Sequence, residues 1–203
     1  VRLVGSEMCI RDRLIVCASR LVPRKGQDQL IRALPEIRRR IPGTRLVLVG
    51  SGRYRGRLHR LARGVEGVSF TGAVDRSTLR DIIATADVFA MPARTRGRGL
   101  DIEGLGIVYL EAQACAVPVV AGDSGGAPET VTEETGVVVD GRDLDALIAA
   151  VSMLLGDEAL RCRMGKAGRA HVSANYSWPV LGDRFRLSLI HIRAHETDSY
   201  LVC

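Results

Sequence analysis

The stretch "GLDIEGLGIVYLEAQACAVPVVAGDSGGAPE", residues 99–129, holds the elements that decide the fold. A glycine-rich segment leads into a helix-like run at 107–116, and a short apolar run at 117–122 follows as a strand. A second glycine loop, "SGGAPE", ends the stretch. Glu103 precedes the predicted helix and Glu111 lies about one turn inside it. Two carboxylates, a helix start and two glycine loops so close together indicate a ligand site beside a strand.

Strand-like and helix-like segments alternate on both sides of this stretch. Apolar, β-branched runs predict strands at 14–19, 44–52, 67–74, 87–92, 117–122 and 135–140. Helical spacing follows at 25–43, 54–64, 77–86, 107–116 and, as two or three helices, 143–187. Because the strands are apolar on both faces, we expect an α/β fold: a Rossmann-like parallel sheet of about six strands, with helices on both faces. Ligands bind such sheets at the carboxyl ends of the strands.

Composition narrows the classes of partner. The net charge is +6, and Lys25 and Lys166 are the only lysines, so the basic side chains are almost all arginines. Aromatic residues make up 4%, too few for the stacking platforms of a single-strand nucleic-acid binder, so no nucleic-acid partner is expected. No apolar run approaches the ~20 residues of a membrane-spanning helix. The five cysteines are scattered without a C-x-x-C pair, which favours a reducing cytoplasm over a zinc site or disulfide framework.

The two ends of the chain do not fit this pattern. Residues 1–13, "VRLVGSEMCIRDR", lack the apolar region and cleavage site of a signal peptide and are similar to a translated sequencing-adapter tail. Residues 188–203 are similar to the matching tail at the other end. We therefore expect one domain, residues 14–187, between two non-native tails.

Charged side chains gather after the first strand and around the central helix. Arg20 and Lys25 follow the strand at 14–19, at the edge where ligands bind. The helix start near Gly106 offers free N–H groups and a partial positive charge, which suit a phosphate. Glu111 would suit the paired hydroxyls of a ribose, and Glu103 a second set of hydroxyls. The pattern predicts a ligand with a diphosphate centre and a sugar on each side.

Plainer interpretations stand beside this one. Taken singly, each of these charges would be an ordinary solvated side chain. "GSGRYRG" is similar to a dinucleotide fingerprint, but Gly50, Gly52 and Gly56 miss its spacing by one residue and follow the second strand. An NAD-type domain is therefore disfavoured, while a non-catalytic nucleotide-binding module stays open. "RTRGRG" at 94–99 is either a solvated loop or a contact for an anionic acceptor or membrane face.

Helix caps follow from short polar residues. Asp75 or Ser77 is expected to cap the helix at 77–86. "DLD" at 143–145 has the form of a metal-binding pair, but it lacks a partner carboxylate nearby. It is expected to cap a late helix instead.

Several motifs together carry a family resemblance. "EGLGIVYLE" resembles the E-x7-E element of retaining glycosyltransferases of the large group-1 (GT4-like) class, which have the two-domain GT-B fold. "SRLVPRKGQDQLI", "FTGAVD", "ADVFAMPARTRGRGLDIEGLGIVYLEAQAC" and "PVVAGDSGGAPETV" follow in the family's order. The resemblance covers about 14–187 and implies the C-terminal, donor-binding domain. Within the class, the segment 94–112 is most similar to actinobacterial GDP-mannose-dependent phosphatidylinositol mannosyltransferases.

The resemblance implies roles for the charged residues. Arg20 and Lys25 would hold the diphosphate of the sugar nucleotide, with assistance from Arg24. Glu103 would bind hydroxyls of the transferred sugar, and Glu111 would bind the ribose. Glu103, Arg20 and Lys25 are the candidate catalytic residues, since they would face the reacting sugar and the leaving diphosphate.

Backbone groups complete the implied site. The donor sugar and distal phosphate would contact the backbone of Gly104, Leu105, Gly106 and Ile107. Val74 would border the base, and "SGGAPE" would shape the floor of the pocket. The sequence departs from the family at Ala116, where many relatives have glycine, and this is expected to affect the end of a helix rather than the chemistry.

The implied chemistry needs no metal and no cofactor, and GDP-mannose is a substrate. The partners implied are a nucleotide sugar and a lipid acceptor, the latter bound through an N-terminal domain that this chain lacks. The chain is expected to be inactive alone, and the intact enzyme to be cytoplasmic, with peripheral contact at the inner face of the plasma membrane. A group-1 transferase that uses UDP-glucose or UDP-N-acetylglucosamine is the alternative within the class.

Overall fold

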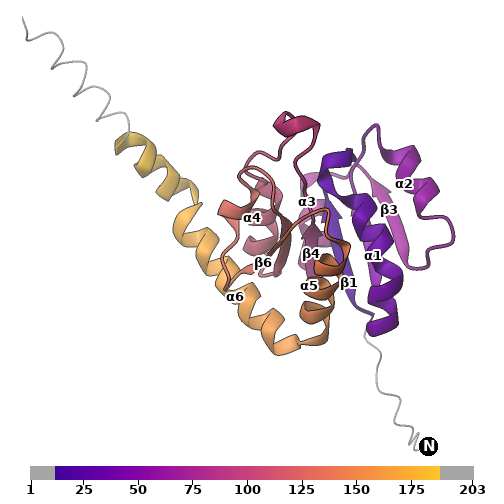
Figure 1. The fold of residues 1–203 in the computed structure, drawn as a ribbon. Helices are drawn as coiled ribbons and strands as arrows, with labels where there is room; N and C mark the ends of the chain where they lie inside the picture. Colours follow the sequence, from indigo (N-terminus) through magenta and orange to yellow (C-terminus); the bar gives the residue numbers. More distant parts are fainter. Residues whose placement is uncertain (1–11, 188–203) are drawn as a thin grey trace, which may run out of the picture.

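The computed structural model describes residues 12–187 (Figure 1). The tails expected at 1–13 and 188–203 lie outside the described residues, apart from Asp12 and Arg13. The Arg13 carbonyl accepts a hydrogen bond from Arg45 N, and its guanidinium lies 3.1 Å from the Asp87 carboxylate. The contacts of the folded domain thus begin one residue before the predicted boundary.

Six parallel strands form one sheet in the order β3-β2-β1-β4-β5-β6. The strands are β1 Leu14–Ala18, β2 Arg45–Val49, β3 Val68–Gly72, β4 Val88–Met91, β5 Val119–Gly122 and β6 Gly136–Val139. The predicted parallel sheet of about six strands is therefore confirmed. The central strands β1, β4 and β5 are buried along almost their whole length, which explains why they are apolar on both faces.

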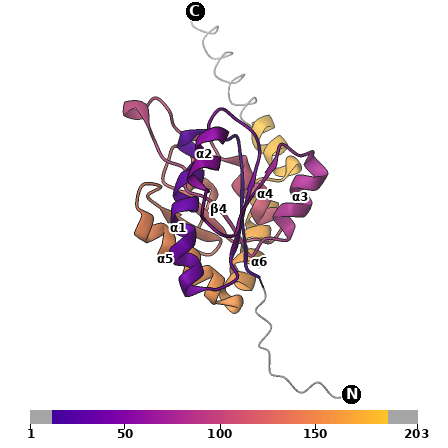
Figure 2. The same ribbon diagram turned by 90° about the vertical axis from the view of Figure 1, so that its right-hand side faces the viewer.

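Helices cover both faces of the sheet (Figure 2). One face carries α1 Gln27–Arg40, α2 Arg55–Leu61 and α5 Leu144–Gly156. The other carries α3 Arg76–Ala84, α4 Ile107–Ala114 and α6 Glu158–Asn175. A further helical segment at 178–187 follows α6 and projects away from the sheet (Figure 1). Short 3-10 helices lie at η1 Pro23–Lys25, η2 Gly97–Gly99 and η3 Ala127–Thr130. The prediction that helices cover both faces of the sheet is therefore confirmed.

The predicted caps are present where the helices begin. Asp75 accepts a hydrogen bond from Thr78 N at 2.8 Å and caps α3, while Ser77, the other candidate, donates its hydroxyl to Asp75. Asp143 caps α5 by accepting from Ala146 N at 2.9 Å, so the "DLD" motif has the predicted capping role.

The strand order locates the binding edge. β1 lies between β2 and β4, so the chain turns in opposite directions across the sheet after β1 and after β4. In open α/β sheets the crevice at such a switch point, outside the carboxyl ends of the strands, is where ligands bind. The loops that flank it are residues 19–26 and 92–106, the two segments that carry Arg20, Lys25 and Glu103.

Candidate functional site

Two adjoining cavities open at the carboxyl edge of the sheet. Cavity A, about 360 Å³, is lined by the ends of β1 and β2, the loop after β3, and α4. Cavity B, about 430 Å³, is lined by the loop after β1 and by the segment that leads into α4. Both cavities include Ala18, Ser19 and Val108. The end of β1 and the first turn of α4 are therefore a wall common to both, over which one two-part ligand could lie.

The predicted site residues divide between the two cavities. Cavity A has Arg20, Val74 and Glu111 in its lining. Cavity B has Arg24, Lys25, Glu103, Gly104, Leu105, Gly106 and Ile107 in its lining. The structure thus brings all of them to one edge of the sheet but places the two glutamates in different cavities.

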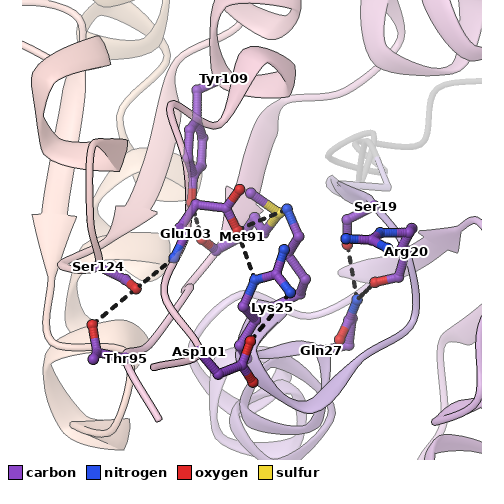
Figure 3. A network of polar contacts seen from close by, with 11 residues as sticks. Ser19, Arg20, Lys25, Gln27, Met91, Thr95, Asp101, Glu103, Tyr109 and Ser124 are labelled. Carbon is purple, nitrogen blue, oxygen red and sulfur yellow. Dashed lines mark hydrogen bonds and ion pairs between the residues drawn. The ribbon is translucent and has the colours of Figure 1, made fainter. Parts of the chain in front are cut away.

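Cavity B contains a buried network of charges (Figure 3). Glu103 is only 5% exposed, and Lys25 Nζ lies 2.8 Å from its Oε2 atom. Arg24 Nε lies 3.6 Å from the same oxygen, and Arg24 Nη1 lies 3.3 Å from Asp101 Oδ1. A carboxylate is costly to bury without a counter-charge, so Lys25 and Arg24 make the position of Glu103 possible. Sequence reasoning placed these residues together but did not foresee that they pair.

The second glycine loop holds Glu103 in place. Glu103 N donates to Ser124 Oγ at 3.2 Å, and Gly126 N donates to Gly104 O at 2.9 Å. A Cβ atom at Gly125 would lie 1.8 Å from Glu103 O, and the backbone there has φ +57°. Only glycine allows this approach. The two glycine loops of the stretch 99–129 are therefore packed against each other. Glu103 lies in the first loop, just before α4, and the second loop contacts its backbone.

Gln27 fixes the loop after β1. Its side chain is fully buried, and Nε2 donates to Ser19 Oγ at 2.8 Å and to Arg20 O at 3.0 Å (Figure 3). The Arg20 side chain is exposed and lies at cavity A. Sequence reasoning missed Gln27. The only available signal was an uncharged polar residue at a helix start, two residues after Lys25.

The start of α4 is tightly built. Gly106 has φ +72°, and a Cβ atom there would lie 2.6 Å from the ring of Tyr109. The Tyr109 hydroxyl donates to Met91 O at 2.6 Å, and burial raises its pKa, so it stays a neutral donor. The first N–H groups of an α-helix lack carbonyl partners inside the helix and carry a partial positive charge. Since Val108 lies in both cavities, this helix end is placed for an anion at their boundary.

Cavity A has a different character. Glu111 is exposed, and it shares the cavity with the apolar side chains of Val49, Val74 and Leu79. Arg20 is the cation in its lining. An apolar slot with one carboxylate suits a flat base joined to a sugar that has paired hydroxyls.

The glycines of "GSGRYRG" have a packing explanation. Gly50 has φ +125°, and a Cβ atom there would lie 2.1 Å from Ser19 O. A Cβ atom at Gly52 would lie 2.4 Å from Leu21 O. These glycines let the loop after β2 lie directly against the loop after β1, and thereby help to form cavity A.

Residues 12–187 contain no group of three or more His, Cys, Asp or Glu side chains placed to bind a metal ion. None of the helices in that part of the chain is long and apolar enough to cross a membrane. Its three cysteines are free, and burial raises the pKa of the Cys17 thiol to about 12.

Comparison with known proteins gives the family. The family model described as "Glycosyl transferases group 1" matches residues 10–171. A Corynebacterium glutamicum protein named GDP-mannose-dependent monoacylated alpha-(1-6)-phosphatidylinositol monomannoside mannosyltransferase is 58% identical over 172 residues, 84% of this chain and 45% of its own length. A Mycolicibacterium smegmatis GDP-mannose-dependent alpha-(1-6)-phosphatidylinositol monomannoside mannosyltransferase is 58% identical over 175 residues, 84% of this chain and 46% of its own. The chain therefore spans about half the length of the curated relatives that it matches.

Solved structures have the same architecture. Sucrose-phosphate synthase from Thermosynechococcus elongatus superposes with a TM-score of 0.79 at 30% identity, over 92% of this chain and 47% of that one. Anabaena Alr3699/HepE in complex with UDP-glucose superposes with a TM-score of 0.78 at 25% identity, over 89% and 49%. The sheet described above is thus the fold of one domain of the GT-B glycosyltransferases. The chain belongs to the group 1 glycosyltransferases, the family that the motifs from Ser19 to Val131 indicate.

Proposed function

We propose that this chain is the donor-binding domain, residues 14–187, of a retaining mannosyltransferase that uses GDP-mannose. The observation that carries the proposal is the pair of cavities joined across the first turn of α4, each with its own carboxylate. Two such cavities match the two ends of a sugar nucleotide, with the diphosphate at the boundary. The names of the relatives that are 58% identical support GDP-mannose as donor and a phosphatidylinositol mannoside as acceptor.

The ligand has one orientation that matches the charges. The mannose and the distal phosphate lie in cavity B, where Glu103 accepts from sugar hydroxyls and the backbone of 104–107 contacts the sugar. The nucleoside lies in cavity A, where Glu111 accepts from the ribose hydroxyls and Val74 borders the base. The diphosphate lies between them, within reach of Arg20, Lys25 and the N–H groups at the start of α4.

Lys25 has a double task in this arrangement. An ammonium group has three donors, so Lys25 can bind a phosphate oxygen while it remains paired with Glu103. In the reaction the bond between the anomeric carbon and the phosphate oxygen breaks, and the oxygen of the acceptor hydroxyl bonds to that carbon and passes its proton to the leaving phosphate. Negative charge develops on the leaving GDP as the bond breaks. Arg20, Lys25 and the helix start stabilise that charge with groups that are already oriented, so the proposal requires no metal or other cofactor.

The acceptor side lies outside the chain. The intact enzyme would use the remaining length seen in the relatives to bind the lipid and orient its hydroxyl, and orientation can contribute roughly 7–11 kcal/mol to lowering a barrier. Because the proposed acceptor is a membrane lipid, we place the intact enzyme in the cytoplasm, with peripheral contact at the inner face of the plasma membrane. Nucleic acid has no part in the proposal.

Calorimetry with the full chain tests the donor. GDP-mannose and GDP are expected to bind, with GDP-mannose the tighter, and to bind equally with and without EDTA. Added salt is expected to weaken both, since Arg20 is exposed. Binding of NAD without binding of GDP would overturn the proposal. A transfer assay with radiolabelled GDP-mannose and a phosphatidylinositol monomannoside is expected to give no further mannosylated lipid, and product formed by this chain alone would show that no further domain is needed.

A donor domain for UDP-glucose is the second candidate. It is favoured by the likeness to Anabaena Alr3699/HepE, whose structure contains UDP-glucose. The same calorimetry separates the two candidates, because the larger guanine and the smaller uracil would occupy cavity A to different extents. Tighter binding of UDP-glucose than of GDP-mannose would favour this alternative.

A further inference from the structure

The loop between β4 and α4 exposes large aliphatic side chains at its tip. We call residues 96–102 the tip loop. Leu100 is 91% exposed and Ile102 is 48% exposed. Figure 1 shows the loop, with η2 at its end, standing out from the body of the molecule at the edge where the cavities open. A leucine this exposed on a projecting loop gains nothing for the fold of the described residues.

The tip loop has a defined shape. Arg96 N donates to Asp101 O at 2.9 Å and Asp101 N donates to Arg96 O at 3.1 Å, which closes the loop at its base. Arg24 Nη1 lies 3.3 Å from Asp101 Oδ1 and ties this base to η1. Arg98 has φ +54° between two glycines that also have positive φ, so the chain reverses tightly just before Leu100. The aliphatic side chains are thus held outward by the backbone.

The charge of the tip loop complements an anionic surface. Arg96 and Arg98 are both exposed, and neither has a salt-bridge partner among residues 12–187. Arginine next to exposed aliphatic residues is the pattern of segments that lie at a membrane interface, where the guanidinium contacts lipid phosphate and the aliphatic group enters the boundary of the acyl chains. What points to an interface is the combination of Leu100, Ile102 and two exposed arginines on one projecting loop, rather than any one exposed side chain.

We infer that the tip loop docks onto a bilayer that contains anionic lipid, with Leu100 and Ile102 in the interface and Arg96 and Arg98 at the head groups. The residue after Ile102 is Glu103, in cavity B, so docking brings the proposed sugar site to the membrane surface. The inference rests on the proposed function in one respect, the lipid acceptor that gives this placement its purpose. The contact itself depends only on the loop.

Vesicle sedimentation with the full chain tests the inference. We expect binding to vesicles of equimolar phosphatidylcholine and phosphatidylinositol, and much weaker binding to phosphatidylcholine alone. Arg96→Gln with Arg98→Gln is expected to weaken binding roughly twentyfold, since each arginine near such a surface contributes about fivefold. Leu100→Ser with Ile102→Ser is expected to weaken it about tenfold. Met153→Ser, at a 47% exposed position on α5, is the matched control and should change nothing.

Insertion has its own readout. Trp178 is the only tryptophan of the chain, so Leu100→Trp in a Trp178→Phe background reports on the tip loop alone. A blue shift of its emission on addition of the anionic vesicles is expected. Unchanged emission, or vesicle binding that the two double variants leave intact, would overturn the inference and would favour cover of the loop by the remaining length that the relatives have.

Nucleotide binding separates this inference from the proposed function. Both double variants are expected to bind GDP-mannose as the parent chain does, which also shows that they are folded. GDP-mannose binding without vesicle binding would overturn the docking role and leave the donor role standing. Vesicle binding that the tip-loop variants abolish, in a chain that binds no nucleotide, would overturn the donor role and leave the docking role standing.

Discussion

Cavities A and B adjoin each other but are built on different principles. In cavity B the carboxylate of Glu103 is buried and paired with Lys25 at 2.8 Å, and two glycine loops hold its backbone. In cavity A the carboxylate of Glu111 is exposed on the outside of α4, among apolar side chains. One carboxylate is part of the folded structure, and the other is a group displayed to the solvent.

The difference separates stability from binding. A buried ion pair contributes little net stability when intact, yet removal of one partner is costly because a lone charge is left in the interior. Changes in cavity B should therefore affect both folding and the sugar end of the donor. Changes at Glu111 should affect only the nucleotide, since an exposed side chain has little role in folding.

The largest effect is expected for Lys25→Ala. The substitution leaves Glu103 buried with only Arg24, at 3.6 Å, to balance it, and should lower the free energy of unfolding by about 3 kcal/mol. Urea denaturation measures this. Lys166→Ala, at the only other lysine and exposed on α6, is the matched control.

A second change tests the cause of that loss. Glu103→Gln in the Lys25→Ala background removes the orphaned charge and should recover most of the stability, but not the binding of GDP-mannose. A Lys25→Ala chain as stable as the parent would break the comparison, because cavity B would then be no more integral to the fold than cavity A.

Gly125→Ala should have the next largest effect. Its Cβ would lie 1.8 Å from Glu103 O, so the two glycine loops must separate, which should cost about 2 kcal/mol. Because the shift moves Glu103, calorimetry should show GDP-mannose weakened more than GDP. Gly56→Ala is the control, since nothing lies within 4 Å of a Cβ there and no loss of stability is expected. Equal weakening of the two ligands would mean that the loop serves the whole site.

Glu111→Ala isolates cavity A. In the proposed orientation Glu111 accepts from the ribose hydroxyls, so its loss should weaken binding of GDP and of GDP-mannose about tenfold each, roughly 1.5 kcal/mol, with the melting temperature unchanged. Glu133→Ala, at another exposed glutamate, is the control and should bind both ligands normally. If the substitution weakened only the added effect of the sugar, the orientation of the donor proposed for the two cavities would be reversed.

Much of the fold followed from short-range pattern. Apolar, β-branched runs predicted each strand of the sheet. A strand that is buried on both faces must be apolar at nearly every position, so its sequence is easily recognised. Strand ends were less predictable: the run 44–52 was too long by several residues, since β2 ends at Val49. Gly50 and Gly52 are there for contact with Ser19 and Leu21, and such contact depends on the packing of two loops that are distant in the sequence.

The gathering of the candidate residues at one edge of the sheet was predictable from the sequence, while their contacts were less so, and their roles in binding stay predictions. The strand-then-loop pattern placed Arg20, Lys25 and Glu103 at one edge. That Lys25 pairs with Glu103 depends on two loops that meet only in the fold, seventy-eight residues apart in the sequence. The role of Gln27 was unpredictable for the same reason. Its hydrogen-bond partners Ser19 and Arg20 lie on the preceding loop, and no short motif indicates these bonds.

Ala116→Gly carries the smallest expected effect and provides the baseline for the others. Ala116 lies just after α4 with φ +59°, a conformation that costs a residue with a Cβ atom and suits glycine. Glycine relieves that strain but gains entropy in the unfolded chain, so the net gain should be about 0.5–1 kcal/mol. Urea denaturation should show the gain, and calorimetry should show unchanged affinity for GDP and GDP-mannose. Because α4 begins at the boundary of the two cavities and Ala116 lies beyond its other end, a change in either affinity would mean that stability and binding are coupled along the helix. The contrast between the buried and the exposed carboxylate would then no longer account for the expected difference between a substitution that destabilises the chain and one that only weakens ligand binding.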